Sequence, residues 1–368
     1  MQLRCRPHSS VWEENDLAHG SNLPVILITM GDPAGIGPEI CVKALADEDM
    51  YQVCRPVIVG DVAVLRRAIE LAGVHVTLNP LGNVSCGVFA AGAIDVLDLA
   101  NVDLALAGLG KVSSAAGKAA YEYVHAGVEL TLSKAADAMV TGPINKEAIN
   151  LAGYHYAGHT EILADLTGAR QYAMMLVDRG LRVVHNSTHV SLRKACDLVK
   201  RDRVLTVIKL AHEAARDLGI PEPRIGVAGL NPHAGEGGLF GTEEIEEIIP
   251  AISAARDLGV DVIGPVPPDS VFARARGGQY DIVVAMYHDQ GHIPLKTVGF
   301  ELDGTTGRAK AVRGVNVTLG LPIVRTSVDH GTAFEIAGTG KANHESMREA
   351  VLLAVRLVGQ RRHRKVIV

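Results

Sequence analysis

Short apolar runs that end in glycine or proline alternate along this chain with longer amphipathic stretches. The first run, Val25–Met30, is closed by Gly31-Asp32-Pro33, and residues 39–46 behind it have a helical pattern. The clearest helix is expected at 203–218, where apolar residues recur at i, i+3, i+4 and i+7. This alternation of buried strands with amphipathic helices predicts a layered α/β sheet. The expected strands are Val25–Met30, Val57–Val59, Val74–Leu78, Ala138–Thr141, Leu181–His185, Ile225–Ala228 and Ile282–Ala285, and further helices are expected at 63–72, at 114–134 and from about Asn343.

The length and composition are those of a two-domain globular protein. The chain has 368 residues, whereas a single domain usually contains about 100–200. Hydrophobic residues make up 48% and charged residues 21%, a balance that argues against disorder of the whole chain. Glycine occurs 39 times while aromatic residues account for only 4%, which favours an α/β protein with tight turns over a β-sandwich.

Charge and cysteine usage narrow the classes of partner and compartment. The formal net charge is −5, so a broad basic face for nucleic acid is not expected. No run approaches about 18 apolar residues, so no membrane span is expected either. The five cysteines include no CxxC pair, which disfavours a disulfide scaffold or a cysteine zinc site and predicts a cytoplasmic protein. Residues 1–24 lack the apolar core of a secretory signal and are interpreted as an extension outside the fold.

Polar residues gather in segments that contain glycine or proline and follow apolar runs. In an α/β sheet such segments are the loops at strand ends, where ligands bind. The first of them, with Gly31, Gly35 and Gly37, does not have the GxGxxG spacing, so a standard dinucleotide fingerprint is not supported and the loop is either a tight turn or a ligand contact. The segments are 31–39, 141–146, 158–161, 188–190, 231–236, 267–270, 287–291, 314–316 and 325–331.

Three histidines head such loops: His189, His233 and His288. They are tens of residues apart, unlike the ligands of a local zinc finger. Three neutral imidazoles that share one divalent ion and leave positions open are typical of a catalytic metal site. The alternative is chance, because 15 histidines will place some at strand ends without any metal.

Fixed cations and hydrogen-bond donors that could recognise an anion lie in the same kind of segment. Lys296, Asn316 and Arg325 follow the third histidine, each near an expected strand end, and His159 and Thr160 add two further donors. The alternative reading of Lys296 and Arg325 is an ordinary surface charge.

Taken together, these segments resemble the 4-hydroxythreonine-4-phosphate dehydrogenase family of vitamin B6 biosynthesis, including its D-threonate and D-erythronate 4-phosphate dehydrogenase paralogues. The resemblance covers nearly everything from Val25 to about Val358. The stretch from Asp329 to Asn343 also looks like the nucleotide-binding stretch of isocitrate and isopropylmalate dehydrogenases. The motifs, in the order in which the family has them, are ITMGDPAGIGPE, GHTE, THVSL, NPHAGE, PPDS, MYHDQG and the run 314–343.

The resemblance implies a two-domain α/β fold of the isocitrate/isopropylmalate dehydrogenase type with the active site in the interdomain cleft. The implied domains are 25–150 plus 310–368 for the nucleotide and 151–309 for the metal, the substrate and dimerisation, in a homodimer whose partner completes the site. The implied residues are His189, His233 and His288 for the metal, His159, Thr160, Lys296, Asn316 and Arg325 for the substrate, Gly331, Thr332, Gly338 and Asn343 for the cofactor, and Lys296 and Asp269 for catalysis.

The implied chemistry is a metal- and NAD-dependent (or NADP-dependent) oxidation and decarboxylation of a phosphorylated 3-hydroxy acid. Zinc, magnesium, manganese and cobalt all fit some of the expected ligands. The candidate substrates are 4-phosphohydroxy-L-threonine and D-threonate or D-erythronate 4-phosphate. A cis-dihydrodiol dicarboxylate of the terephthalate type is the alternative substrate, and a metal-dependent hydrolase or aldolase is the alternative class.

The sequence departs from the vitamin B6 biosynthetic members of the family at two places. Both bear on the identity of the substrate more than on the reaction chemistry. His292 stands where the biosynthetic members usually carry an apolar residue, and about 12 extra residues occupy 301–312. The His-Ile-Pro variant resembles the branch that oxidises D-threonate or D-erythronate 4-phosphate, and it also occurs in relatives that act on terephthalate cis-dihydrodiol.

Overall fold

The computed structural model of the chain describes residues 23–178, 180–299, 301–302, 309–311 and 314–367. Within these residues the chain forms two compact units. The terminal unit contains 23–169, 309–311, 314–316 and 321–367, and the central unit contains 170–178, 180–299, 301–302 and 317–320. Residues 1–22 of the predicted extension, and most of the predicted insertion at 301–312, lie outside the described residues.

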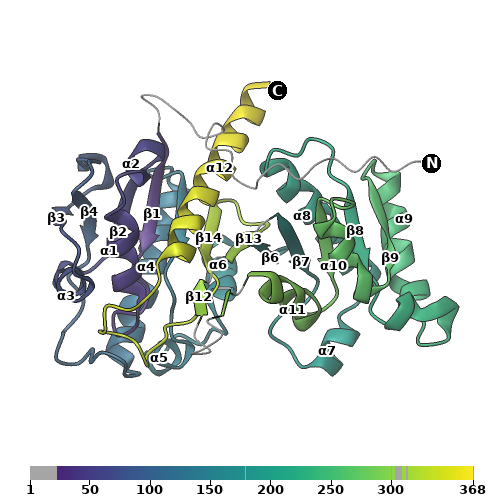
Figure 1. The fold of residues 1–368 in the computed structure, drawn as a ribbon, viewed down its shortest axis with the longest axis horizontal. Coiled ribbons are helices and arrows are strands. Elements are labelled where there is room, and N and C mark those ends of the chain that lie inside the picture. Colours follow the sequence, from purple (N-terminus) through teal and green to yellow (C-terminus); the bar gives the residue numbers. More distant parts are fainter. Residues whose placement is uncertain (1–22, 179, 300, 303–308, 312–313, 368) are drawn as a thin grey trace. The chain divides into compact units, whose positions relative to one another are not determined.

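The terminal unit is built on a parallel sheet whose strands neighbour one another in the order β3-β4-β2-β1-β5-β14 (Figure 1). Buried runs such as Ile26–Ile28 form the centre of this sheet, as a parallel sheet covered on both faces requires. The strands are β1 Val25–Thr29, β2 Arg55–Gly60, β3 Thr77–Leu81, β4 Ala93–Asp98, β5 Ala138–Thr141 and β14 Val324–Val328.

The helices of the terminal unit begin at residues that cap them. The Asp61 side chain accepts hydrogen bonds from the first turn of α3, Ser113 does so for α4 and Asn145 for α5. Helix α4 packs on β1, β5 and α5, and α12 packs on β14. The helices are α1 Gly37–Leu45, α2 Met50–Val53, α3 Val62–Ala72, α4 Ser114–Leu132, α5 Lys146–Leu151, α6 His159–Thr167 and α12 Glu345–Ile367, with a short 3-10 turn, η2, at Val84–Cys86.

In the central unit the strands neighbour one another in the order β13-β6-β7-β10-β8-β9. β6 and β7 are antiparallel, whereas β7, β10, β8 and β9 run parallel. The strands are β6 Ala173–Asp178, β7 Leu181–His185, β8 Ile225–Ala228, β9 Val262–Val266, β10 Ile282–Ala285, the short β11 Glu301–Leu302 and β13 Val315–Leu319, of which residues 317–319 belong to this unit; the short strand β12 Ala309–Ala311 belongs to the terminal unit. The helices are α7 Leu192–Asp197, α8 Arg201–Asp217, α9 Ile249–Asp257, α10 Pro268–Arg276 and α11 His288–Gly299, with η3 Pro232–Gly238 and η4 Glu244–Ile248.

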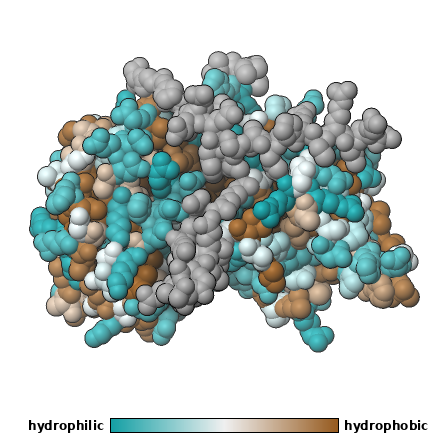
Figure 2. Space-filling model, viewed as in Figure 1, coloured by the Kyte–Doolittle hydropathy of each residue, from teal (hydrophilic) through white to brown (hydrophobic). Residues whose placement is uncertain are grey.

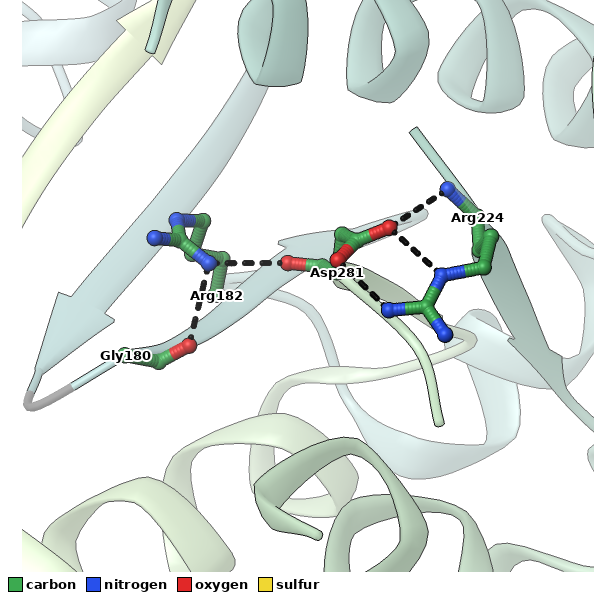
Figure 3. A network of polar contacts seen from close by, with 4 residues as sticks. All are labelled: Gly180, Arg182, Arg224 and Asp281. Carbon is green, nitrogen blue, oxygen red and sulfur yellow. Dashed lines mark hydrogen bonds and ion pairs between the residues drawn. The ribbon is translucent and has the colours of Figure 1, made fainter. Parts of the chain in front are cut away.

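An ion pair fixes the amino-terminal ends of three parallel strands in the central unit (Figure 3). Arg224, just before β8, forms two side-chain hydrogen bonds to the carboxylate of Asp281, just before β10, at 3.0 and 2.9 Å. Arg182 in β7 donates to the backbone oxygen of Asp281 at 3.1 Å. Burial alone would raise the pKa of Asp281, but the hydrogen bonds from Arg224 outweigh it and the pKa is lowered. The polar groups at this edge therefore have a structural role, and the opposite edge is where the loops of interest begin.

The two compact units differ from the predicted domains at residues 151–169 and at 317–320, and 317–320 group with the central unit. Residues 151–169 group with the terminal unit, whereas the sequence suggested a boundary after residue 150. The physical reason is that α5 and α6 both pack against α4. The segment that carries His159 therefore belongs with β5 and β14.

The surface shows hydrophilic residues over most of each unit in the view of Figure 2, with separate hydrophobic patches between them. None of the helices in the described part of the chain is long and apolar enough to cross a membrane.

Candidate active site

The three predicted metal ligands follow the carboxyl ends of three adjacent parallel strands in the central unit. His189 comes after β7, His233 after β8 and His288 after β10. Because β7, β10 and β8 are neighbours and run parallel, these three loops leave the same edge of the sheet. The sequence pattern thus placed each histidine at a strand end, and the sheet order makes the three ends adjacent.

Two of these histidines lie close together. The ring centroids of His189 and His288 are 5.8 Å apart. The Nδ1 atom of His288 is 2.6 Å from Oδ1 of Asp289, a contact that would leave Nε2 as the ring nitrogen for the predicted metal. Imidazole donors oriented by a neighbouring carboxylate are the donor set that a divalent transition metal prefers, so this pair fits such an ion.

His233 lies in a strained turn and is not grouped with the other two. Its φ angle is +52°, and Ala234 and Glu236 also have positive φ angles, which are uncommon outside glycine. Glu244 holds the start of this turn by accepting backbone hydrogen bonds from Leu230 and Asn231, both at 2.7 Å. Among the residues that the structure describes, no group of three or more histidine, cysteine, aspartate or glutamate side chains is arranged to hold a metal ion. The triad therefore remains a prediction, with two of its members together in one chain.

His292, one of the two departures from the family pattern, lies directly on His288. The two rings stack with centroids 3.6 Å apart and an interplanar angle of 12°. The Nδ1 atom of His292 is 2.9 Å from the backbone oxygen of His288. Burial, followed by the charge of His288, lowers the pKa of His292 to about 4, so this ring is neutral at pH 7. A predicted departure from the family pattern thus contacts a predicted metal ligand.

The two predicted catalytic residues lie on separate helices of the central unit. Asp269 is in the first turn of α10, and Lys296 is in the last turn of α11. Asp269 lines a groove of about 740 Å³ together with Asp289, Phe272 and Ile293. The groove therefore connects Asp269 with the carboxylate of Asp289, which contacts His288. The catalytic role of Lys296 stays a prediction.

A second polar cluster lies in the terminal unit around Arg325. This arginine is on β14 and is only 2% exposed. One of its terminal nitrogens, Nη2, donates to Oγ1 of Thr141 at the end of the neighbouring strand β5, at 2.6 Å. Burial lowers the pKa of Arg325 to about 9, against the opposing charge of Glu161, so the guanidinium remains a cation at neutral pH.

His159 opens helix α6 beside this arginine. Burial, followed by the charges of Arg325 and Lys146, lowers its pKa well below the usual range, so the ring is neutral. Its Nε2 atom is buried without a hydrogen-bond partner. Thr160 follows in the same turn of α6. The predicted substrate residues His159 and Arg325 are thus brought together, 166 residues apart in sequence, by the pairing of β5 with β14 and by the packing of α6 on α4.

Two residues of this cluster were not predicted individually. A Cβ atom placed on Gly158 would lie 3.5 Å from Oε2 of Glu161 and 3.7 Å from Cε of Lys146, so both side chains border that glycine. Their segments, 141–146 and 158–161, were recognised as ligand loops from sequence, but only the strand order shows that the two loops meet. Asn316, the remaining predicted contact of this unit, has a buried Oδ1 atom without a hydrogen-bond partner.

The predicted cofactor stretch packs on the glycine loop and helix α1 of the same unit. The backbone N–H of Ile36 donates to the Thr332 oxygen at 3.0 Å, and the N–H of Gly338 donates to Oε1 of Glu39 at 2.6 Å. Lys43 holds the stretch further along through two backbone oxygens, at 2.7 and 2.8 Å. Gly331 and Asn343 are exposed whereas Thr332 is buried. The Oδ1 atom of Asn343 accepts from the N–H of Glu345 at 2.7 Å, so Asn343 lies just before α12, near the predicted start of that helix.

Asp32, in the glycine loop, is fully buried. Its ionised carboxylate is therefore less favourable in the native state than in the unfolded chain. Burial raises its pKa to about 6, although the backbone N–H groups of Ala34 and Asn145 donate to it and oppose the rise. The unfolded chain ionises near pH 3.8, so between pH 3.8 and 6 the native state holds more protons. The contribution of Asp32 to stability is therefore fully present below pH 3.8 and is lost, by about 3 kcal/mol, as the pH rises through 6.

We expect Asp32→Asn to remove this pH-dependent loss, because an amide keeps the acceptor oxygen but cannot ionise. The variant should match the wild-type protein in unfolding free energy at pH 4 and exceed it by about 3 kcal/mol at pH 7.5. Urea unfolding at the two pH values measures this difference. A stability gap of equal size at both pH values would contradict the assignment.

Comparisons with known proteins place the chain in a family. Residues 52–354 match the family described as pyridoxal phosphate biosynthetic protein PdxA. A protein of Clostridium botulinum that is provisionally named a D-threonate 4-phosphate dehydrogenase is 47% identical over 336 residues, which cover 91% of this chain and 97% of that protein. A similarly named protein of Symbiobacterium thermophilum is 48% identical over 328 residues, which cover 89% of this chain and 95% of that protein.

Solved structures agree with this placement. The crystal structure of 4-hydroxythreonine-4-phosphate dehydrogenase from Klebsiella pneumoniae has a TM-score of 0.81 and 46% identity, covering 92% of this chain and 99% of that one. A terephthalate 1,2-cis-dihydrodiol dehydrogenase from Burkholderia xenovorans LB400 has a TM-score of 0.63 and 32% identity, covering 91% and 98%. The predicted dehydrogenase class is thus confirmed: the protein is an oxidoreductase that acts on a CH–OH group. The chain belongs to the pyridoxal phosphate biosynthetic protein PdxA family.

Proposed function

We propose that the protein oxidises the 3-hydroxyl group of a small phosphorylated hydroxy acid with NAD or NADP and then releases carbon dioxide from the β-keto acid. The observation that carries the proposal is the cluster around Arg325: a buried guanidinium held by Thr141, with Lys146 and a neutral His159 beside it. A phosphate accepts several charge-assisted hydrogen bonds at once, each about twice as strong as a neutral one. Such a cluster suits the dianionic end of the substrate.

Among the candidate substrates we favour D-threonate or D-erythronate 4-phosphate. The relatives at 47% and 48% identity carry a D-threonate 4-phosphate dehydrogenase name. His292 supports the same branch, because it lies on a predicted metal ligand. 4-Phosphohydroxy-L-threonine is the second candidate, since the Klebsiella pneumoniae structure bears the name of that activity.

The cis-dihydrodiol alternative is supported by the 32% identical relative. Such a ring would present a carboxylate, not a dianionic phosphate, and its walls would need apolar or aromatic side chains. The chain is only 4% aromatic, and the cluster around Arg325 is polar, so this substrate ranks below the acyclic phosphates.

The metal ligands in this proposal are His189 and His288 from one chain and His233 from a second copy, which makes the protein a homodimer with a shared site. A bound divalent ion would supply Lewis acidity that lowers the pKa of the substrate hydroxyl, and NAD or NADP would accept the hydride. His288 is oriented for this role by Asp289 and His292. Lys296 either donates a proton to the intermediate after decarboxylation or contacts an anionic group.

The cofactor residues remain those predicted: Gly331, Thr332, Gly338 and Asn343. The contacts of Glu39 and Lys43 support this assignment, because they hold the backbone of the stretch while leaving Asn343 exposed. The four described cysteines, Cys41, Cys54, Cys86 and Cys196, are free thiols, which supports the proposed cytoplasmic location.

The test is a dehydrogenase assay with four substrates. D-Threonate 4-phosphate, D-erythronate 4-phosphate, 4-phosphohydroxy-L-threonine and a cis-dihydrodiol dicarboxylate are each added with NAD or NADP and a divalent metal. We expect reduced nucleotide and carbon dioxide in equal amounts from at least one acyclic phosphate, with loss of activity after chelation. Turnover of the cyclic diol alone, or cleavage of the phosphates without nucleotide reduction, would overturn the proposal.

A further inference from the structure

Glu161 places a carboxylate inside a cluster that otherwise suits an anion. It lies in the first turn of α6, and it borders Gly158 together with Lys146. Its Oε2 atom is buried and has no hydrogen-bond partner. Its charge acts on the buried Arg325, partly opposing the effect of burial on that residue's pKa. The proposed phosphate site thus includes an acceptor that a phosphate cannot satisfy.

The charges of the cluster show what this carboxylate does to ligands. Arg325 and Lys146 are cations, His159 is neutral, and Glu161 cancels one positive charge. A dianionic phosphate offers only acceptor oxygens, so it gains nothing from Glu161 and is repelled by it. A buried carboxylate oxygen without a hydrogen-bond donor is also destabilising. A ligand that brings a hydrogen-bond donor beside its phosphate relieves both costs.

We propose that Glu161 is a specificity-determining residue that accepts a hydrogen bond from the donor on C2 of the substrate, next to the hydroxyl that is oxidised. This inference rests on the proposed function and names the part of the substrate that this site recognises. A 2-hydroxyl group, as in threonate or erythronate, and a 2-ammonium group, as in 4-phosphohydroxy-L-threonine, share the required donor chemistry. Phosphate esters without that donor are rejected.

A purely structural role for Glu161 makes a different prediction. If the carboxylate served only to hold Arg325 and Lys146 in place, its removal would weaken the binding of every phosphate ligand. If it acts as the acceptor proposed here, its removal strengthens the binding of bare phosphate and weakens the preference for a C2 donor. The two roles therefore differ in the sign of one measurable effect.

The experiment compares wild-type protein with Glu161→Gln, which removes the charge and keeps the size. Inorganic phosphate binding is measured by calorimetry at pH 8. We expect Glu161→Gln to bind inorganic phosphate about tenfold more tightly, because a like charge is gone. Glu147→Gln, on the exposed face of the neighbouring helix α5, is the matched control and should bind like wild type.

Steady-state kinetics provide the second part of the test. D-Erythronate 4-phosphate is compared with its 2-deoxy analogue, 3,4-dihydroxybutanoate 4-phosphate, and 4-phosphohydroxy-L-threonine is compared with the same analogue. We expect the ratio of kcat/KM values to favour the C2 donor by at least about tenfold in wild type, and this ratio to fall about tenfold in Glu161→Gln. The substrate whose ratio falls more identifies the donor as hydroxyl or ammonium.

A further variant, Glu161→Asp, keeps the charge and shortens its reach, so it should bind inorganic phosphate like wild type and still lose the C2 preference. Weaker or unchanged phosphate binding in Glu161→Gln would overturn the inference, as would an unchanged C2 preference. If no phosphorylated hydroxy acid is turned over by the wild-type protein, the proposed function fails, and the calorimetric arm still decides whether Glu161 opposes phosphate.

Discussion

Replacing Arg325 with methionine should lower kcat/KM for a phosphorylated substrate by about 10³-fold, mainly through KM. The guanidinium is 2% exposed and is fixed by a 2.6 Å hydrogen bond to Thr141. Losing a buried, charge-assisted contact of this kind costs about 2–5 kcal/mol of binding free energy. Methionine has a similar length and carries no charge, and replacing a buried ion by a packed apolar side chain need not unfold the protein.

Two further variants separate charge from geometry in this prediction. Arg325→Lys keeps a cation but loses the planar fork, so we expect an intermediate loss. Arg348→Met removes another arginine of the terminal unit, which lies on α12 and donates to the Asp47 carboxylate at 3.0 Å. This variant should leave the kinetics near wild type. Steady-state kinetics with the favoured substrate, alongside thermal unfolding of each variant, provides the measurement. A wild-type KM in Arg325→Met would show that the phosphate binds elsewhere.

The strands that precede the candidate loops were predictable because their runs are short and apolar, and three of the four are bounded by glycine on one side. Ala138–Thr141, Leu181–His185, Ile225–Ala228 and Ile282–Ala285 agree with the structure residue for residue. The predicted strand Val74–Leu78 lies earlier than the observed β3, Thr77–Leu81. β3 is partly exposed, so its burial pattern gives a weaker signal.

β14 was not predicted as a strand because its middle residues are polar. Arg325, Thr326 and Ser327 are all buried, and each has a polar contact that the sequence pattern does not reveal. Thr326, for example, donates to the backbone oxygen of Ala350 in α12 at 2.7 Å. A strand that is polar and buried is recognised only from its partners. The sequence therefore identified Arg325 as a candidate contact without locating it in the sheet.

Lys146 and Glu161 were missed for the same physical reason. Their neighbourhood depends on pairing between β5 and β14, whose contact residues Thr141 and Arg325 are 184 positions apart. Motif reading identified the two loops but gave no measure of their distance. His189 and His288 were better placed from sequence, because adjacent parallel strands deliver their loops to one edge.

Alanine at His189, His233 or His288 should each weaken divalent metal binding by at least about 100-fold, with the loss of most activity. The ring centroids of His189 and His288 are 5.8 Å apart in one chain, and His233 is not grouped with them. The proposal therefore takes the pair from one subunit and His233 from the other. Metal affinity is measured by titration of the metal-free protein, which gives a readout that does not depend on turnover.

Mixing inactive variants then tests which subunit supplies each ligand. In a heterodimer of His189→Ala and His233→Ala, one of the two shared sites keeps all three histidines, so random subunit exchange should restore about a quarter of wild-type activity and metal capacity. In a heterodimer of His189→Ala and His288→Ala, every site lacks one member of the same-chain pair, so nothing should be restored. The second mixture is the matched control, because both mixtures carry one alanine per chain. Recovery in both mixtures, or in the second alone, would show that His189 and His288 do not bind one ion from the same chain. No recovery in either mixture would place all three ligands within one subunit and refute the shared site.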